Sequence, residues 1–200
     1  MDTKKAAAPE RRGSARERLL AAADALFYEG GIHTVGIDRV IERAGVAKAS
    51  LYDCFGSKEE LVRAYLQGRQ DARRARIETR LARCATPRDR ILEVFTAMAD
   101  FAAQPNFRGC AFARAGAESP PGSPVKTTCD DARQWLHELF AGLARDAGAR
   151  DPEVLARQLV LLHDGAAVSA QMEHGGAPAL AARAAAALLL DAATAPAQAA

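Results

Sequence analysis

The stretch Ala44-Gly45-Val46-Ala47-Lys48-Ala49-Ser50-Leu51-Tyr52 decides the fold of this 200-residue chain. Apolar residues at Ile37, Val40 and Ile41 precede it at helical spacing. Gly45 stands where a sharp turn requires a residue that tolerates a positive φ angle. The stretch therefore predicts two short amphipathic helices joined by a tight turn, the arrangement called a helix-turn-helix.

The segments on either side of this motif predict two longer helices. Upstream, Ser14 and Glu17 have the spacing of a capping box, and the helix that they open ends at Gly30-Gly31. Downstream, Ser57 and Glu60 repeat that spacing and open a long helix that continues to about residue 84. The apolar face of the upstream helix consists of Leu19, Leu20, Ala23, Leu26 and Phe27.

The rest of the chain has helical periodicity and no run that alternates apolar and polar residues like a half-buried strand. Proline and glycine residues divide it into further helical segments. These span about residues 87–103, 109–118, 124–147, 151–174 and 177–193. The sequence therefore predicts an all-α fold.

The motifs and the charge balance exclude several classes of function. The sequence contains no HExxH, GxSxG or Walker-type motif, and the histidines lack metal-ligand spacing to each other or to the cysteines. We therefore predict no enzymatic activity, no cofactor and no metal site. The formal net charge is +2, and residues 1–64 contain eleven basic and ten acidic side chains. Binding to nucleic acid must then rely on a few well-placed cations.

The sequence also predicts the compartment. The N-terminus has no apolar signal region, and the most apolar stretch, residues 184–190, is far shorter than the roughly 20 residues that span a bilayer. The four cysteines are widely spaced, as expected of reduced thiols. We predict a cytoplasmic protein with no membrane-spanning segment.

Several short runs around the motif resemble the TetR family of bacterial repressors. They are Leu19 to Phe27, Gly36 to Ile41, Ala44 to Tyr52, and Phe55-Gly56-Ser57-Lys58-Glu59-Glu60-Leu61. The resemblance covers residues 14–64, and its last run is the most characteristic. It implies an all-helical homodimer in which each chain has a three-helix DNA-binding head and a body of about six helices. It also implies that the helix from about residue 47 enters the major groove of DNA.

Composition and resemblance together predict four parts of the chain. Residues 1–13 form a disordered basic arm, which suits either a solvated tail or contact with DNA phosphates. Residues 14–57 form the helix-turn-helix domain, and residues 58–194 form a helical domain for effector binding and dimerisation. Residues 195–200 form a disordered tail.

The predicted DNA contacts lie near the starts of helices, where free backbone N–H groups and cationic or phenolic side chains bind phosphate well. By position in the resembling motif, Lys48 and Ser50 meet DNA near the start of their helix, and Tyr52 and Lys58 meet phosphates. The full set is Gly36, Lys48, Ala49, Ser50, Tyr52, Asp53 and Lys58.

Asp53 departs from the usual pattern of the family, in which basic, amide or histidine residues are more common at this position. An aspartate that faces the groove repels phosphate unless it accepts a hydrogen bond from a cytosine amino group. Asp53 therefore either contacts a base in this way or forms an ion pair with a neighbouring arginine, and we favour the ion pair.

The last two predicted helices carry apolar faces that suit the dimerisation role they have in the family. Residues 151–193 would form a four-helix interface with the same segment of a second chain. Some of these residues must also serve the core of their own chain. The predicted stripes are Val154, Leu155, Leu159, Leu162, Ala166 and Ala170 in one helix, and Leu180, Ala184, Ala187, Leu188 and Leu190 in the other.

The resemblance places an effector pocket among the middle helices. Aromatic and soft side chains would line it and a few polar groups would orient the ligand, although such residues at helical spacing more often form core. The candidates are Phe95, Met98, Phe101, Cys110, Phe112, Trp135 and His163. We expect the effector, whose identity the sequence does not specify, to be small and largely apolar.

Together these features predict a ligand-responsive, sequence-specific transcriptional regulator that binds a palindromic operator in double-stranded DNA. We favour a repressor that a small molecule releases, because a compact dimer on DNA most simply blocks access by polymerase. The alternatives are a helical enzyme, or a protein-binding adaptor that has kept the helix-turn-helix scaffold without its DNA binding.

Overall fold

The computed structural model describes residues 13–195, and these residues form nine α-helices and no β-strand. The helices are α1 (Ala15–Gly30), α2 (Ile37–Ala44), α3 (Lys48–Phe55), α4 (Lys58–Leu81), α5 (Pro87–Ala102), α6 (Ala111–Glu118), α7 (Pro124–Asp146), α8 (Pro152–Glu173) and α9 (Ala177–Thr194). Every helix predicted from the sequence is present, so the all-α fold is confirmed. The predicted arm, 1–13, and tail, 195–200, lie almost wholly outside the described residues.

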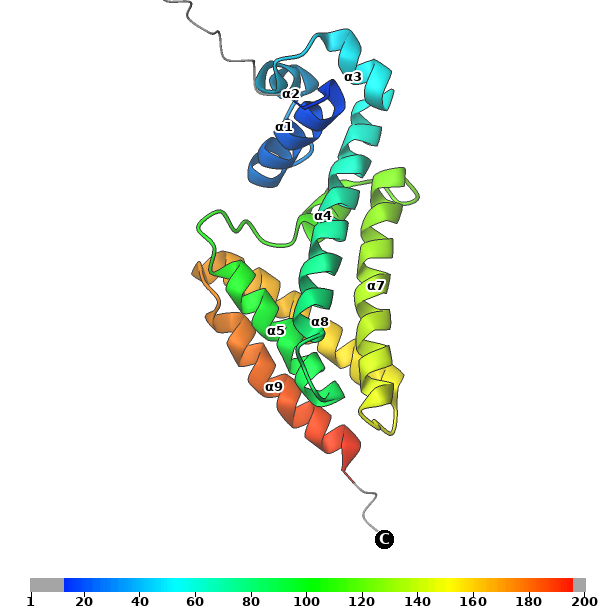
Figure 1. The fold of residues 1–200 in the computed structure, drawn as a ribbon, viewed down its shortest axis with the longest axis vertical. Coiled ribbons are helices and arrows are strands. Elements are labelled where there is room, and N and C mark those ends of the chain that lie inside the picture. Colours follow the sequence, from blue (N-terminus) through cyan, green and yellow to red (C-terminus); the bar gives the residue numbers. More distant parts are fainter. Residues whose placement is uncertain (1–12, 196–200) are drawn as a thin grey trace, which may run out of the picture. The chain divides into compact units, whose positions relative to one another are not determined.

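The chain divides into two compact units, with the division between Tyr65 and Leu66. The head unit contains α1, α2, α3 and the beginning of α4 (Figure 1). The body unit contains the rest of α4 and α5 to α9. The sequence placed a boundary at residues 57 and 58, where α4 begins. Leu61 and Tyr65 of α4 are nevertheless buried with the head, and this explains why the head unit extends further along the chain.

The head unit packs around the apolar face of α1, against which both α2 and α3 lie. Ser14 and Glu17 form the predicted capping box, in which the Glu17 amide donates to the Ser14 hydroxyl at 3.2 Å. Phe27 meets Tyr65 of α4 edge to face, with ring centroids 5.6 Å apart. Leu19 and Ala23 are fully buried on the same face. The periodicity of α1 therefore produces the head core directly.

The turn between α2 and α3 depends on Gly45, whose φ angle of 61° lies in the left-handed region. A residue with a Cβ atom adopts this conformation only at a cost, so glycine is favoured here. Arg18 of α1 donates from Nη1 to the Gly45 carbonyl oxygen at 3.1 Å. Leu51 is fully buried and anchors α3 in the head core. The turn and its second helix are thus both held in place.

The body core lies among α5, α7, α8 and α9. Phe95 of α5 and Phe140 of α7 are fully buried, with ring centroids 5.7 Å apart. Figure 1 shows α8 and α9 adjacent in the chain and packed together. The small side chains of α9 allow close packing against neighbouring helices. The buried face of α9 consists of three alanines and one leucine: Ala179, Ala182, Ala186 and Leu190.

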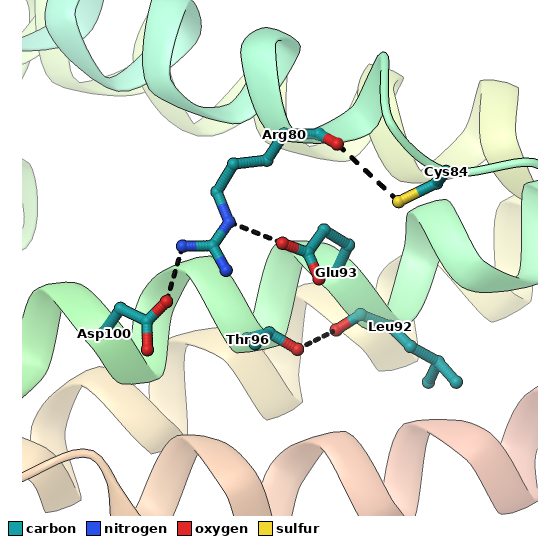
Figure 2. Close-up of polar contacts among 6 residues, drawn as sticks. All are labelled: Arg80, Cys84, Leu92, Glu93, Thr96 and Asp100. Carbon is teal, nitrogen blue, oxygen red and sulfur yellow. Dashed lines mark hydrogen bonds and ion pairs between the residues drawn. The ribbon is translucent and has the colours of Figure 1, made fainter.

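A cluster of ion pairs joins the end of α4 to α5 (Figure 2). Arg80 Nε lies 2.5 Å from Glu93 Oε1, and Arg80 Nη1 lies 2.5 Å from Asp100 Oδ2. The hydrogen bonds to Asp100 and Glu93 raise the pKa of Arg80 above its ordinary value. Cys84 Sγ donates to the Arg80 carbonyl oxygen at 3.7 Å. Arg80 is therefore a structural residue of the body unit.

By length and composition alone, α9 is long and apolar enough to cross a membrane. The sequence-based prediction of no membrane-spanning segment considered only the shorter apolar run of residues 184–190. One such helix is weak support for a span, because the interior helix of a helical core meets the same criteria. The packing of α9 against α5 and α8 gives it a place in the body core.

Candidate functional site

The exposed side of α3 is polar and contains most of the predicted DNA contacts. Lys48, Ala49 and Asp53 are exposed, Tyr52 is 45% exposed, and Ser50 is half-buried. Positions 48, 49, 52 and 53 share one side of a helix because their spacing matches its period. Leu51, in contrast, points into the head core. The predicted division of α3 into an inner and an outer side is therefore present in the structure.

Lys48 and Asp38 form an ion pair that the sequence analysis did not anticipate. Lys48 Nζ of α3 lies 3.0 Å from Asp38 Oδ1 in the first turn of α2. The hydrogen bond that Lys48 donates to Asp38, followed by the negative charge of Asp38, raises the pKa of Lys48. The two residues are ten positions apart across the turn, so no helical spacing signals their contact. The main cation of α3 thus carries a counterion on α2.

Asp53 is exposed and forms no ion pair with any residue in the range 13–195, so the favoured pairing with an arginine was wrong. Arg16 of α1 lies instead over the ring of Phe55, with its Cζ atom 5.2 Å from the centroid. The cation is therefore engaged by an aromatic ring. Contact between Asp53 and a base stays a prediction.

The starts of α2 and α3 lack side-chain caps within the described part of the chain. Gly36 caps α2 and Ala47 caps α3, and neither supplies a side-chain hydrogen bond to the first turn. Backbone N–H groups at such starts attract anions. Arg39, which the sequence analysis overlooked, is exposed in the first turn of α2. The sequence offered a signal for Arg39, because a basic residue next to Asp38 falls in the first turn of the helix that begins the motif.

Lys58, at the start of α4, is half-buried. Its Nζ atom lies 6.0 Å from the centroid of the Phe27 ring in the head core. Ser57 caps the same helix by accepting a hydrogen bond from the Glu60 amide at 3.1 Å. The position of Lys58 is thus fixed by packing, and its contact with phosphate remains a prediction.

The predicted pocket residues fall into two groups in the body unit. Phe95 and Met98 are part of the hydrophobic core, and Phe101 packs edge to face on Phe107 with centroids 5.5 Å apart. The second group surrounds a side chain of α4 that the sequence analysis did not select, Arg73. It consists of Cys110, Phe112, Trp135 and His163.

Arg73 lies against two aromatic rings. Its Cζ atom is 4.8 Å from the ring centroid of Phe112 and 5.2 Å from that of Trp135. Its Nη2 atom donates to the Ala132 carbonyl oxygen at 2.6 Å. The many arginines of α4 resemble a solvated helix face in the sequence, so nothing there distinguishes Arg73 from the others.

Burial sets the charge states of this cluster. Burial, followed by the positive charges of Arg76 and Arg74, lowers the pKa of Arg73 to about 10. Burial, followed by the charges of Arg73 and Arg133, lowers the pKa of His163 to about 3. At neutral pH the cluster therefore contains a protonated Arg73 and an uncharged His163.

A separate open groove with a volume of about 770 Å³ lies on the body unit between α7 and α8. Its walls combine polar residues such as Arg133, His137 and Glu153 with apolar ones such as Val160 and Leu161. None of the residues predicted to line the effector pocket borders it. The groove is therefore distinct from the cluster around Arg73.

Val154 of the predicted α8 stripe and Leu180 and Leu188 of the predicted α9 stripe are exposed. Leu155, Leu159, Ala166 and Ala170 are instead buried in the core of their own chain, so of the two roles left open for the stripe they have the core role and not the dimer role. The apolar side chains of α8 that remain exposed recur mostly at every seventh residue. The sequence contained this heptad-like spacing, which is typical of a helix face that packs against another helix. We call these exposed side chains, with two leucines of α9, the α8–α9 apolar face: Val154, Leu161, Val168, Met172, Leu180 and Leu188.

The fold and the sequence were compared with known proteins. The family described as "Bacterial regulatory proteins, tetR family" matches residues 19–65. The solved structure of a TetR-family transcriptional regulator from Streptomyces coelicolor superposes with a TM-score of 0.86 and 32% sequence identity, covering 90% of this chain and 96% of that chain. The chain belongs to the TetR family.

Two curated relatives of this TetR-family protein are named for opposite effects on transcription. The transcriptional activator FasR of Mycolicibacterium smegmatis is 38% identical over 92 residues, which are 46% of this chain and 40% of that protein. The transcriptional repressor KstR2 of Mycobacterium tuberculosis is 37% identical over 84 residues, which are 42% of each protein. The matches thus span less than half of either relative. Family membership makes the protein a DNA-binding transcriptional regulator.

Proposed function

We propose that this TetR-family protein is a cytoplasmic, ligand-responsive repressor that binds a palindromic operator as a homodimer. A small molecule that binds the body unit releases it from DNA. The observation that carries the proposal is the polar outer side of α3, with Tyr52 45% exposed and Leu51 fully buried behind it. This arrangement suits a helix that enters the major groove, with Lys48 near its start and Asp53 facing the bases.

Dimerisation follows from the limits of a single short helix. One α3 helix contacts too few base pairs for specificity, whereas two of them about 34–36 Å apart would contact successive turns of the same duplex face. The α8–α9 apolar face supplies a surface for the pairing. Met172 is 76% exposed and Leu188 is 72% exposed, and large apolar side chains left exposed in this way suit an interaction site. We therefore assign the dimer contact to residues within 151–193.

Release by a ligand requires two arrangements of the dimer with different affinities for DNA. A ligand that binds one arrangement better shifts the population toward it by its difference in affinity. α4 is a continuous helix with residues in both units, and we propose it as the element that links ligand binding to the head. Repression rather than activation is proposed because a dimer on an operator blocks polymerase without further contacts.

The test is a mobility-shift titration of the full-length protein on the DNA that flanks its own gene, with Tyr52→Ala and Lys48→Ala as variants. Loss of the phenol hydroxyl or of the cation removes a phosphate contact, and we expect each variant to bind about tenfold more weakly. Arg83→Ala, an exposed change just beyond α4, is the control. Equal binding by all the variants, or equal binding to unrelated duplexes, would contradict the assignment and favour the adaptor alternative.

A further inference from the structure

Five polar side chains of the body unit contain buried atoms without a hydrogen-bond partner among the described residues: Gln70, Arg73, Arg74, Arg76 and His163. Gln70 is only 4% exposed, and both its Oε1 and Nε2 atoms are unpartnered. Arg73 Nε and His163 Nδ1 are also buried and unpartnered. Burying such groups without partners costs free energy, and native proteins rarely accept it without a functional reason. Several unsatisfied polar groups in one unit therefore call for a physical explanation.

Gln70, Arg73 and His163 come from two helices of the body unit. Gln70 and Arg73 are three residues apart on α4, a spacing that places them on one side of the helix. His163 comes from α8, and its ring centroid lies 6.3 Å from that of Phe95. The charge of Arg73 acts on His163. Arg73 and His163 therefore influence each other electrostatically, and Gln70 lies about one helical turn before Arg73 on α4.

The surroundings of Arg73 attract its charge without satisfying its hydrogen bonds. Phe112 and Trp135 lie 4.8 Å and 5.2 Å from its Cζ atom, and aromatic rings attract a cation but are weak acceptors. Nη2 of Arg73 donates a hydrogen bond to the Ala132 carbonyl oxygen. The Nε–H group still requires an acceptor, and a carboxylate or phosphate oxygen is the acceptor that a guanidinium fits best.

Arg73 also lacks a counterion. It forms no ion pair with any residue between 13 and 195, and the nearby carboxylate of Asp164 is paired with Arg133. Arg74 adds a further positive charge, with its Cζ atom 5.1 Å from the Trp135 ring centroid. The cluster therefore has an excess of positive charge.

Arg80 shows how the same helix holds an arginine that serves the fold. Its Nε and Nη1 atoms each lie 2.5 Å from a carboxylate oxygen, of Glu93 and Asp100 respectively (Figure 2). Arg73, seven residues earlier, is more enclosed yet has a single backbone carbonyl as its acceptor. Among the described residues, Arg80 therefore has two carboxylate acceptors and Arg73 has none.

We propose that the effector of this regulator is an organic oxyanion with an apolar body, whose acidic group binds Arg73 while Gln70 and His163 supply further polar contacts. Phe112 and Trp135 would contact the apolar part. The proposal rests on the ligand-responsive function proposed above and specifies the class of ligand. It refines the expectation of a largely apolar effector by adding an acidic group at one end.

The test uses full-length protein and the fluorescence of Trp135, the single tryptophan of the chain. Octanoate and 3-phenylpropionate are titrated beside octanamide and 3-phenylpropionamide, which have nearly the same shape without the charge. Octyl phosphate distinguishes a phosphate site from a carboxylate site. We expect the acids to bind about 10- to 100-fold more tightly than their amides, the range of a charge-assisted hydrogen bond. Arg73→Met should abolish that preference, and Arg83→Met should keep it.

Thermal unfolding of the ligand-free variants separates binding from folding. Because Arg73 lacks a counterion, Arg73→Met should leave Tm unchanged or raise it, whereas Arg80→Met should lower it. If Arg73→Met does not fold, Gln70→Leu should still weaken binding of the acids. Equal affinity for acids and amides, or no response to any of the probes, would overturn the proposal.

A mobility-shift assay with the bound acid distinguishes this proposal from the proposed function. Binding that depends on Arg73 and weakens the protein–operator complex supports both. Binding that depends on Arg73 without any effect on the complex supports the oxyanion site and contradicts release by its ligand.

Discussion

The Nζ atom of Lys48 in α3 lies 3.0 Å from the Oδ1 atom of Asp38 in α2, so one ion pair joins the two helices of the helix-turn-helix. The side chains are 59% and 81% exposed, and a pair this exposed contributes little to folding stability. Its consequence is electrostatic. Asp38 offsets the charge of a lysine on the side of α3 that we assign to DNA.

Replacing Asp38 with asparagine should strengthen DNA binding. Asp38→Asn removes a negative charge next to Lys48 and keeps a polar residue in the first turn of α2, so a gain of a few-fold is expected. Lys48→Ala should weaken binding and make the slope of log affinity against log salt shallower by about 1, the loss of one phosphate contact. Fluorescence anisotropy with labelled operator at several salt concentrations measures both effects.

Asp131→Asn, an exposed change on α7 of the body unit, is the matched control for charge. It should leave affinity nearly unchanged. Weaker binding by Asp38→Asn would show that the carboxylate positions Lys48 for DNA rather than competing with it. Because residues 1–64 contain eleven basic and ten acidic side chains, a slope steeper than about −10 for the wild-type protein would also contradict the predicted small number of phosphate contacts.

Charges on the α8–α9 apolar face should separate the dimer. Leu161 is 61% exposed and Met172 is 76% exposed, so Leu161→Glu and Met172→Glu are expected to be tolerated within one chain. Burying either new carboxylate in an interface without a partner would be costly. Sedimentation velocity should then show monomers at concentrations where the wild type is dimeric.

Ala75→Glu adds the same charge at an exposed position of α4 and should leave the dimer intact. If the α8 variants sediment like the wild type while remaining folded, the dimer contact lies elsewhere on the chain.

Loss of the Arg80 ion pairs should destabilise the body unit. The Arg80 and Glu93 side chains are 27% and 24% exposed, so this ion pair is neither fully solvated nor fully buried. We expect Arg80→Met to lower the free energy of unfolding by about 1 to 2 kcal/mol, between the effects typical of surface and of buried ion pairs. Chemical denaturation measures the change, and a double-mutant cycle with Glu93→Gln isolates the pair. Full additivity of the two substitutions would show that Arg80 does not stabilise the fold through Glu93 and would leave Asp100 and packing as its contributions.

Acid should weaken the fold through His163. Burial and the charges of Arg73 and Arg133 lower its pKa from 6.5 to about 3. Between those values the unfolded chain binds a proton that the folded chain does not, so the free energy of unfolding decreases as pH falls from 6.5 toward 3. The slope from this group is at most about 1.4 kcal/mol per pH unit.

Denaturation curves at a series of pH values, compared between the wild type and His163→Gln, isolate this contribution. The difference in unfolding free energy should change with pH below about 6.5 and level off above it. His137→Gln is the control on the neighbouring helix α7. A constant difference across the whole pH range would mean that His163 has its ordinary pKa in the folded protein.

Much of the helical organisation could be predicted because its signals act within a few residues. Ser14 and Glu17 form the capping box that their spacing indicates, and Gly45 has the positive φ angle that the turn requires. Leu51 is buried and Tyr52 exposed because neighbouring positions of a short helix point in different directions. The outer side of α3 followed from the same periodicity.

The sequence by itself therefore determined the helices, their ends, the family motif and the inner and outer sides of α3, since each depends on spacing along one segment. Only the tertiary structure decided which side chains from different helices meet. It paired Lys48 with Asp38, left Asp53 without an ion pair among residues 13–195, and placed Arg73 against the rings of Phe112 and Trp135. It also buried Leu159 while exposing Leu161. The physical reason is that an apolar or charged residue has the same local signal whichever helix covers it, so partners are chosen by packing in three dimensions.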